Sequence, residues 1–132
     1  MRYLLSIYGD ESSWSDMTPE DGAREMAAYE ALGRELRDAR AFVGGEGLQP
    51  TATATTVRVR DGERMLTDGP FAETREQLGG FYVVECANLD EAIGWAAKIP
   101  GAAHGCVEVR PVMDYEAMGR EDAHTRSEGA AS

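Results

Sequence analysis

The fold of this chain is organised around residues 68–86, which read DGPFAETREQLGGFYVVEC. The second half of this stretch, Phe81 to Cys86, is an apolar run with the length of a strand, and it predicts a central β-strand. The first half combines two turn signals, Gly69-Pro70 and Gly79-Gly80, with several charged residues. Loops of this composition either connect elements or present polar groups at the mouth of a pocket, and the sequence leaves both interpretations open.

The composition of the whole chain narrows the class of protein. It has 132 residues, 42% of them hydrophobic, and a formal net charge of −11, which predicts one acidic globular domain with one core. The acidity argues against nucleic acid or an anionic membrane as a partner, and no apolar run approaches the about 20 residues that span a bilayer. Residues 1–10 read as a strand and not as a signal peptide, and Cys86 and Cys106 have no metal-site spacing. We therefore expect a cytoplasmic protein without metal or cofactor.

Hydrophobic periodicity and capping residues predict the order of elements. Thr18 with Pro19, and Asn88 with Glu91, are typical of helix starts, and Asp61-Gly62 predicts a two-residue hairpin turn. The predicted elements are a strand at 2–8, a helix from Thr18 to about Ala39-Arg40, strands at 42–48, 53–60 and 63–67, a helical turn or two within 72–78, a strand at 81–86, a helix from Asn88 to Ile99 and a strand at 104–112. The apolar stripes of the two helices are expected to be Met26, Tyr29, Leu32 and Leu36, and Ala92, Ile93, Ala96 and Ile99.

This order predicts an α+β domain at residues 1–113 with a ferredoxin-like split βαβ topology and an inserted β-hairpin, followed by a polar tail at residues 114–132. Both helices should cover one face of the sheet, because βαβ crossovers are right-handed. Strand alternation then sorts the side chains by face. We expect the helices to contact Leu5, Ile7, Tyr82, Val84, Val107 and Val109. The other face should carry Ser6, Tyr8, Phe81, Val83, Glu85, Cys106, Glu108 and Arg110.

The second face of the sheet is too apolar to be fully exposed to solvent, yet it carries ionisable groups. One interpretation is a homodimer in which two sheets pack face to face and enclose a partly polar cavity that holds a small molecule. The other interpretation is that Glu85, Glu108 and Arg110 form ordinary cross-strand pairs at a wet face. The sequence does not decide between them.

Five stretches of the chain resemble, in order, the DGPF-domain branch of the YCII-related proteins. They are YLLSIYGD (3–10), GGEGLQP (44–50), TDGPFAET (67–74), QLGGFY (77–82) and VEVRP (107–111). The resemblance covers roughly residues 1–113 and implies a dimeric α+β barrel.

The resemblance implies less about activity. The YCII superfamily includes a dehydrochlorinase that acts on a chlorinated hydroxyquinol, with a His–Asp pair proposed as its active site. The two histidines of this chain are His104 and His124, so the family's histidine role is carried over to no residue here. DGPF members are often encoded beside extracytoplasmic-function sigma factors, which implies a regulatory or stress setting.

Two carboxylates of the DGPF loop are the candidate catalytic residues. Asp68 would act as a general base if a cavity desolvates it, or it hydrogen-bonds its own turn. Glu73 would be a second carboxylate at the same mouth, or would accept backbone hydrogen bonds. Phe71 is expected to anchor the loop in a core, and His104 is either a surface residue or an acid–base partner for a carboxylate.

The candidate ligand-binding residues are polar or aromatic groups at strand ends and on the second face. They are Tyr8, Asp10, Glu46, Phe71, Glu85, Glu108 and Arg110. Packing, turn capping or a solvated sheet edge would explain each of them equally well. Cys86 and Cys106 read as small buried hydrophobes and not as nucleophiles.

Two functional hypotheses of different classes follow. The first is a cofactor-independent small-molecule lyase or isomerase that uses a carboxylate base of the Asp68 loop. The second is a non-catalytic ligand-binding or regulatory protein associated with a sigma-factor pathway. The sequence leaves open whether the protein is an enzyme.

Overall fold

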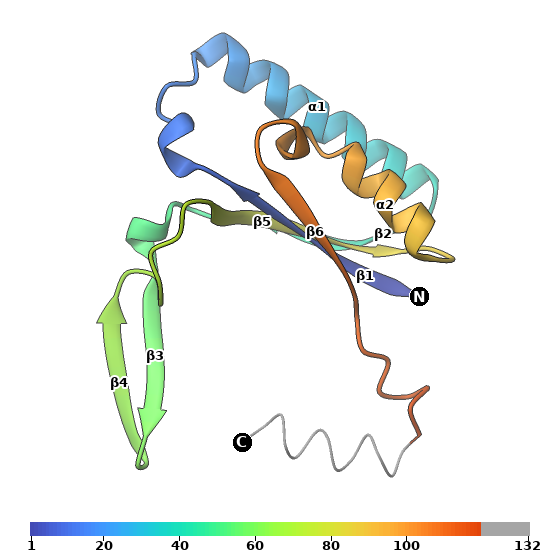
Figure 1. Cartoon of the computed structure of the whole chain (residues 1–132). Coiled ribbons are helices and arrows are strands. Elements are labelled where there is room, and N and C mark those ends of the chain that lie inside the picture. Colours follow the sequence, from blue (N-terminus) through green and yellow to red (C-terminus); the bar gives the residue numbers. More distant parts are fainter. Residues whose placement is uncertain (120–132) are drawn as a thin grey trace.

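A computed structural model describes residues 1–119 (Figure 1). Residues 120–132, and with them most of the expected polar tail, lie outside the described part. The elements, with η for a 3-10 helix, are β1 (Arg2–Gly9), η1 (Glu11–Ser13), α1 (Pro19–Asp38), β2 (Phe42–Gly47), η2 (Thr51–Thr53), β3 (Thr55–Arg60), β4 (Glu63–Asp68), β5 (Gln77–Glu85), α2 (Leu89–Ala97), η3 (Pro100–Ala103) and β6 (Cys106–Pro111).

Four strands form one antiparallel sheet in the order β2-β5-β1-β6. Both α-helices lie on the same face of this sheet, and no helix formed by residues 1–119 lies on the other face, called here the helix-free face (Figure 1). Each helix connects two strands that are separated by one other strand, as right-handed split βαβ units require. The expected α+β fold of ferredoxin-like topology is therefore confirmed.

The helix boundaries follow from the predicted capping residues. The Thr18 hydroxyl accepts a hydrogen bond from the Asp21 N–H at 3.1 Å, and Pro19 occupies the first turn of α1. Asn88 accepts from the Glu91 N–H at 3.0 Å, while the Glu91 carboxylate accepts from the Ala87 N–H at 2.8 Å. The Asn88 cap is thus the one that the sequence predicted, whereas the return bond of Glu91 comes from Ala87, one residue before the N-cap, and not from Asn88 as in a regular capping box.

The core lies between the helices and the sheet. Its buried residues are Tyr3, Leu5, Leu32, Leu36, Ala41, Val84, Ala92, Ala96 and Ile99, with Ile7, Tyr82, Val107 and Val109 packed against them. The predicted division of strand residues between the two faces is thus confirmed on the helix side. Two expected stripe residues are wrong, because Met26 is 66% exposed and Ile93 is 49% exposed.

The loop before β5 differs from the prediction. Phe71 does not anchor in a core, since its side chain is 77% exposed, and residues 72–76 form bends and turns without helix. Strand β5 begins at Gln77, four residues earlier than expected, because Gly79 and Gly80 lie within the strand and are not a hinge. Gly79 is the extra residue of a bulge, opposite the Ile7/Tyr8 step of β1.

The inserted hairpin is confirmed and forms a separate two-stranded sheet of β3 and β4. Its turn residues Asp61 and Gly62 have φ values of 52° and 77°, the left-handed pair of a type I′ turn. In Figure 1 the hairpin extends away from the body on the side opposite the helices. It leaves the main sheet close to the end of the sheet where Gly9 and Gln77 are paired.

Candidate functional site

An open cleft of about 1600 Å³ lies between α1, along Asp21 to Arg37, and the sheet. Its walls come from α1, the η1 segment, η3, and the ends of β1, β2 and β5. This volume exceeds the several hundred Å³ typical of small-molecule pockets, so one ligand would occupy part of the cleft.

The floor of the cleft is rich in glycine, and two glycines of β2 show why. A Cβ atom at Gly45 would lie 2.8 Å from the Phe81 carbonyl oxygen and 2.9 Å from Cδ1 of Tyr82. Gly45 is therefore required by the close packing of the neighbouring strand and its aromatic ring. A Cβ atom at Gly47 would meet nothing within 4 Å, and Gly47 has no positive φ. Neither sterics nor backbone geometry requires glycine there, and the absent side chain leaves space in the cleft.

Aromatic side chains form the walls. Trp14 lies over the floor, since a Cβ at Gly79 would be 2.8 Å from its ring. The hydroxyl of Tyr29 accepts a hydrogen bond from the Gly101 N–H at 3.1 Å, and Tyr82 packs edge-on against Phe42 with ring centroids 6.5 Å apart. Burial raises the pKa of both tyrosines, so each keeps its hydroxyl proton at neutral pH. The cleft thus presents flat apolar surfaces with neutral hydroxyl groups.

Several predicted site residues border this cleft together. Tyr8, Asp10, Glu46 and His104 all line it. The Asp10 carboxylate is already engaged, because it accepts hydrogen bonds from the hydroxyl of Ser12 at 2.7 Å and from its N–H at 2.9 Å. These bonds lower the pKa of Asp10, the side-chain bond most strongly. Asp10 is therefore a weak base that caps η1, whereas Glu46 and His104 stand at the cleft as exposed titratable groups.

The DGPF-loop candidates lie elsewhere in the single chain. Asp68, Phe71 and Glu73 are exposed, and none of them lines the cleft. The loop is held at its two ends instead. At one end the Gly69 N–H donates to the Ala54 carbonyl at 2.7 Å, and at the other the Gln77 side chain accepts from the Glu11 N–H at 2.9 Å.

Glu11 joins three segments near the mouth of the cleft. Its carboxylate accepts from the backbone N–H and the hydroxyl of Thr51, both at 2.7 Å, while its own N–H donates to Gln77. Because Thr51 precedes the hairpin and Gln77 begins β5, this network fixes η1 against the base of the hairpin. The sequence analysis did not single out Glu11, whose partners lie 40 and 66 residues away.

The remaining candidates lie on the helix-free face of the sheet. Arg110 pairs with Glu108 at 2.6 Å along β6, and Glu85 pairs with Arg2, its cross-strand partner, at 3.8 Å. These exposed ion pairs match the interpretation in which the face is wetted and its charges neutralise one another. They lie apart from the cleft, so the structure divides the predicted ligand-binding residues into two groups.

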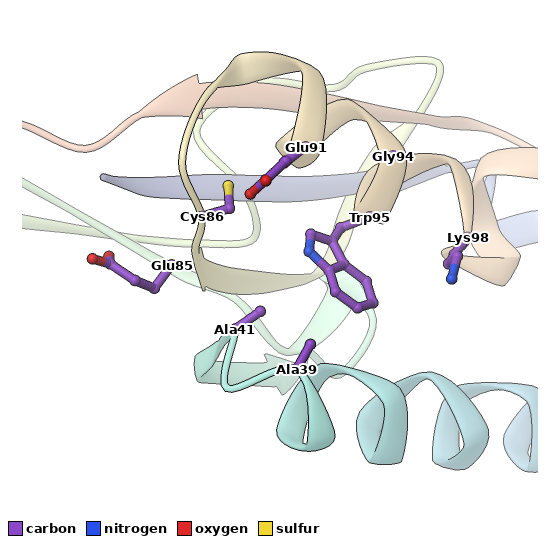
Figure 2. A pocket seen from close by; sticks show the side chains of 8 residues that line it. All are labelled: Ala39, Ala41, Glu85, Cys86, Glu91, Gly94, Trp95 and Lys98. Atoms are coloured by element: carbon purple, nitrogen blue, oxygen red, sulfur yellow. The ribbon is translucent and has the colours of Figure 1, made fainter.

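A second hollow of about 430 Å³ lies between α2 and the C-terminal end of α1 (Figure 2). Figure 2 shows the indole of Trp95 extending from α2 toward Ala39 and Ala41. Lys98, which also lines the hollow, lies 5.2 Å from the Trp95 ring and pairs with Glu35 at 3.6 Å. Burial, and secondarily Glu91, raises the pKa of the Cys86 thiol. A protonated thiol is a poor nucleophile, so this hollow offers little chemistry.

Across residues 1–119, no three His, Cys, Asp or Glu side chains are grouped so that they would hold a metal ion. No helix within the same residues combines the length and hydropathy of a membrane span.

The aromatic walls are the functional feature that the sequence analysis missed. Helical spacing predicts Tyr29 for the apolar stripe of the first helix, and strand alternation predicts Tyr82 for the helix-facing side of the sheet. Trp14 belongs to neither pattern. The available signal was the glycine content of 42–48 and 79–80, which indicates close approach of a backbone or ligand. It did not identify which aromatic rings would stand over those glycines.

Comparisons with known proteins place the chain in a family. It is 41% identical over 118 residues to an uncharacterized protein of Rhizobium meliloti (strain 1021), and the alignment covers 88% of this chain and 95% of the relative. The family model of the YCII-related domain matches residues 1–116, which include every element described above. The chain therefore belongs to the YCII-related family.

Proposed function

We propose that this protein binds a small, planar, largely uncharged molecule in the cleft beside α1. The observation that supports this most directly is the cleft's surface, where aromatic side chains face a glycine floor. Gly47 carries the argument, because no neighbour occupies the space of its missing side chain. Flat rings and backbone suit a planar ligand, and the neutral hydroxyls of Tyr29 and Tyr82 would orient it by hydrogen bonds.

The two tryptophans allow a site-specific test. Trp14 lines the cleft and Trp95 lines the smaller hollow. A Trp95→Phe variant therefore reports on the cleft alone, and a Trp14→Phe variant reports on the other hollow. We expect catechol and hydroquinone, used as planar probes, to change the fluorescence of the Trp95→Phe variant saturably and to leave that of Trp14→Phe unchanged. No saturable change up to about 1 mM, the half-filling point of a site worth about 4 kcal/mol, would refute the proposal.

A matched substitution locates the ligand within the cleft. Gly47→Val should weaken probe binding without loss of stability, because its side chain fills open space in the cleft. Gly94→Ala on α2 is the control, since a Cβ there also meets nothing within 4 Å but faces the other hollow. Equal probe affinity in both variants would place the ligand elsewhere.

A second candidate function is the cofactor-independent lyase or isomerase activity with a carboxylate base. Its support is that Glu46 and His104 are both among the residues that border the cleft with the aromatic walls, and this chemistry needs a carboxylate base near an acid–base partner. Asp68 and Glu73 lie outside the cleft of their own chain. They remain candidate catalytic residues only if they border a cleft that is formed with a second chain.

Chloride release from a chlorinated hydroxyquinol, the substrate class of one superfamily member, is the assay for this activity. Elimination requires a base that removes a proton as chloride leaves. We expect Glu46→Gln to lower kcat more than it changes KM. If chloride is released no faster than in protein-free solution, the protein does not have this activity toward that substrate. The proposal that the cleft binds a planar ligand would be unaffected.

The assembly and setting of the protein are part of the proposal. We place it in the DGPF branch on the five sequence stretches quoted above, as a cytoplasmic homodimer that encloses a cavity between its sheets, with residues 1–113 as the domain and 114–132 as a tail. The apolar residues on the helix-free face support the dimer. The association of DGPF members with sigma factors supports a regulatory role, which co-purification with the neighbouring sigma factor would test.

A further inference from the structure

The hydroxyl group of Tyr29 is a polar group of the cleft whose position is fixed by the backbone. Tyr29 belongs to α1, is half-buried and lines the cleft. Its oxygen accepts a hydrogen bond from the Gly101 N–H of η3 at 3.1 Å. A Cβ atom at Gly101 would lie 3.0 Å from this oxygen and 2.9 Å from Cγ2 of Ile7, so glycine permits the close approach of η3. The hydroxyl is therefore held at one place on the cleft wall.

The proton of this hydroxyl is not used in a hydrogen bond to any group of residues 1–119. A tyrosine hydroxyl can donate one hydrogen bond as well as accept, and Tyr29 accepts from Gly101 without donating. Burial raises the pKa of Tyr29, so the proton is present at neutral pH. The bond from the Gly101 N–H also polarises the hydroxyl and strengthens its capacity to donate. A ligand in the cleft is thus offered a hydrogen-bond donor in a fixed position.

The charges around Tyr29 decide which acceptors suit this donor. Glu25 lies one turn earlier on the same side of α1 and also lines the cleft. After burial, the charge of Glu25 is the next cause that raises the pKa of Tyr29. The carboxylates that border the cleft as a whole are those of Asp10, Asp16, Asp21, Glu25, Glu30 and Glu46. An anionic acceptor placed at Tyr29 would be repelled by these charges.

The two arginines that border the cleft do not offset this repulsion at Tyr29. Arg24 is already paired with Asp21. Arg37 stands over the ring of Phe42, with its guanidinium carbon 4.7 Å from the ring centroid. It also lies eight residues beyond Tyr29 on α1, which is about 12 Å along the helix axis. An uncharged acceptor, in contrast, would gain the hydrogen bond of Tyr29 without any repulsion from Glu25.

We propose that the ligand of the cleft carries an uncharged carbonyl or amide oxygen that accepts a hydrogen bond from the Tyr29 hydroxyl. Tyr29 is then a specificity-determining residue, because it distinguishes such a ligand from a hydrocarbon of the same shape. Glu25 distinguishes it from a carboxylate of the same shape. This inference rests on the planar ligand proposed above and adds the chemical class of its polar group.

Three planar probes of similar size test the role of Tyr29. Benzamide carries a neutral acceptor, benzoate an anionic one and toluene none. Binding is followed at pH 8, above the reference pKa of imidazole, by the fluorescence of Trp14 in the Trp95→Phe protein. We expect Tyr29→Phe to weaken benzamide binding about threefold to tenfold, as for the loss of one neutral hydrogen bond, and to change toluene binding less than about twofold. Retained toluene binding also shows that the cleft of the variant is intact. Equal effects on benzamide and toluene would overturn the proposal.

A second pair of variants tests the discrimination against anions. Benzoate should bind at least about fivefold more weakly than benzamide, and Glu25→Gln should reduce this difference. Glu35→Gln is the control, because Glu35 does not line the cleft and lies about 15 Å further along α1, beyond the screening length of about 8 Å at physiological ionic strength.

The probes also separate failure of this inference from failure of the proposed function. Benzoate that binds as tightly as benzamide would overturn the inference, while saturable toluene binding would still support a planar ligand in the cleft. No saturable binding of any of the three probes would overturn the planar-ligand proposal and this inference with it.

Discussion

Two glycines on one strand should respond differently to substitution by alanine, and the difference in stability tests how the cleft is built. Gly45 and Gly47 are two residues apart on β2 and both line the cleft. We expect Gly45→Ala to destabilise the fold and Gly47→Ala to leave its stability equal or slightly higher. The two substitutions add the same methyl group, so the difference between them measures the surroundings alone.

The magnitudes follow from the geometry. A methyl group at Gly45 would lie 2.8 Å from a backbone oxygen and 2.9 Å from the Tyr82 ring, and the oxygen belongs to the neighbouring strand, which cannot move freely. Overpacking of this kind typically costs about 1–3 kcal/mol. At Gly47 the methyl group meets nothing within 4 Å. Loss of glycine's freedom in the unfolded chain should then stabilise the protein by about 0.4–1 kcal/mol.

Urea unfolding monitored by circular dichroism measures the difference. With a slope of about 2 kcal/mol per M, the Gly45→Ala midpoint should fall by about 0.5–1.5 M and the Gly47→Ala midpoint should stay or rise slightly. The slope itself should be the same in all three proteins. Equal midpoints for the two variants would show that the close packing of β2 on β5 is not what requires Gly45, and the steric argument for the cleft floor would fail.

Three other predictions concern single polar groups. The pKa of Asp10 is lowered in the folded chain, first by its hydrogen bond with the Ser12 hydroxyl. The ionised carboxylate therefore stabilises the fold fully above its unfolded pKa near 3.8. This stabilisation is lost as the pH falls through the lower pKa of the folded chain. The stability gap between wild type and Asp10→Asn should therefore close below about pH 4, and a gap that widens in acid would contradict this. Cys106 is exposed, so the prediction that it is buried is wrong. The pKa of its thiol is raised by desolvation and then by Glu76, whose carboxylate lies 3.8 Å away. Glu76→Gln should accordingly speed alkylation of Cys106 by iodoacetamide at pH 8, and an unchanged rate by peptide mass spectrometry would argue against the coupling. Asn88→Ala should cost about 1 kcal/mol in urea unfolding, and Asn88→Asp should restore most of it, unless the cap contributes nothing.

Local chemistry made most of the fold predictable. Helix caps and tight turns depend on residues that are neighbours in the sequence, so they can be recognised without the structure. Examples are Thr18, Asn88 and the Asp61-Gly62 turn. The division of β-strand residues between two faces needs only period-two alternation and the handedness of the crossovers. The inward positions of Leu5 and Val84 followed from these rules, and both are buried.

Long-range contacts explain what was not predicted. Gly79 reads as a hinge in isolation, but it is a strand residue because the ring of Trp14, 65 positions earlier, lies over it. Phe71 reads as a core anchor because large aromatic residues usually bury, yet the elements around it leave it exposed. The candidate site was only partly predictable for the same reason, since no local pattern tells that Tyr8, Glu46 and His104 meet at one cleft while Asp68 does not.

One pair of variants can decide whether the DGPF loop has a structural role or a catalytic one. Gly69 has a φ of +98°, a left-handed conformation that costs other residues about 1–2 kcal/mol, and its N–H and carbonyl hold the base of the β3–β4 hairpin. If the loop serves to hold the hairpin, Gly69→Ala should lower the free energy of unfolding in urea by about 1–2 kcal/mol, while Asp68→Asn, which removes only a charge, should leave it nearly unchanged. The reverse result, with Asp68→Asn abolishing chloride release and Gly69→Ala harmless to stability, would make the loop catalytic. The exposed positions of Asp68 and Glu73 in the single chain favour the geometric role, because a general base must reach its substrate, and here only the flanks of the loop make the contacts that organise the molecule.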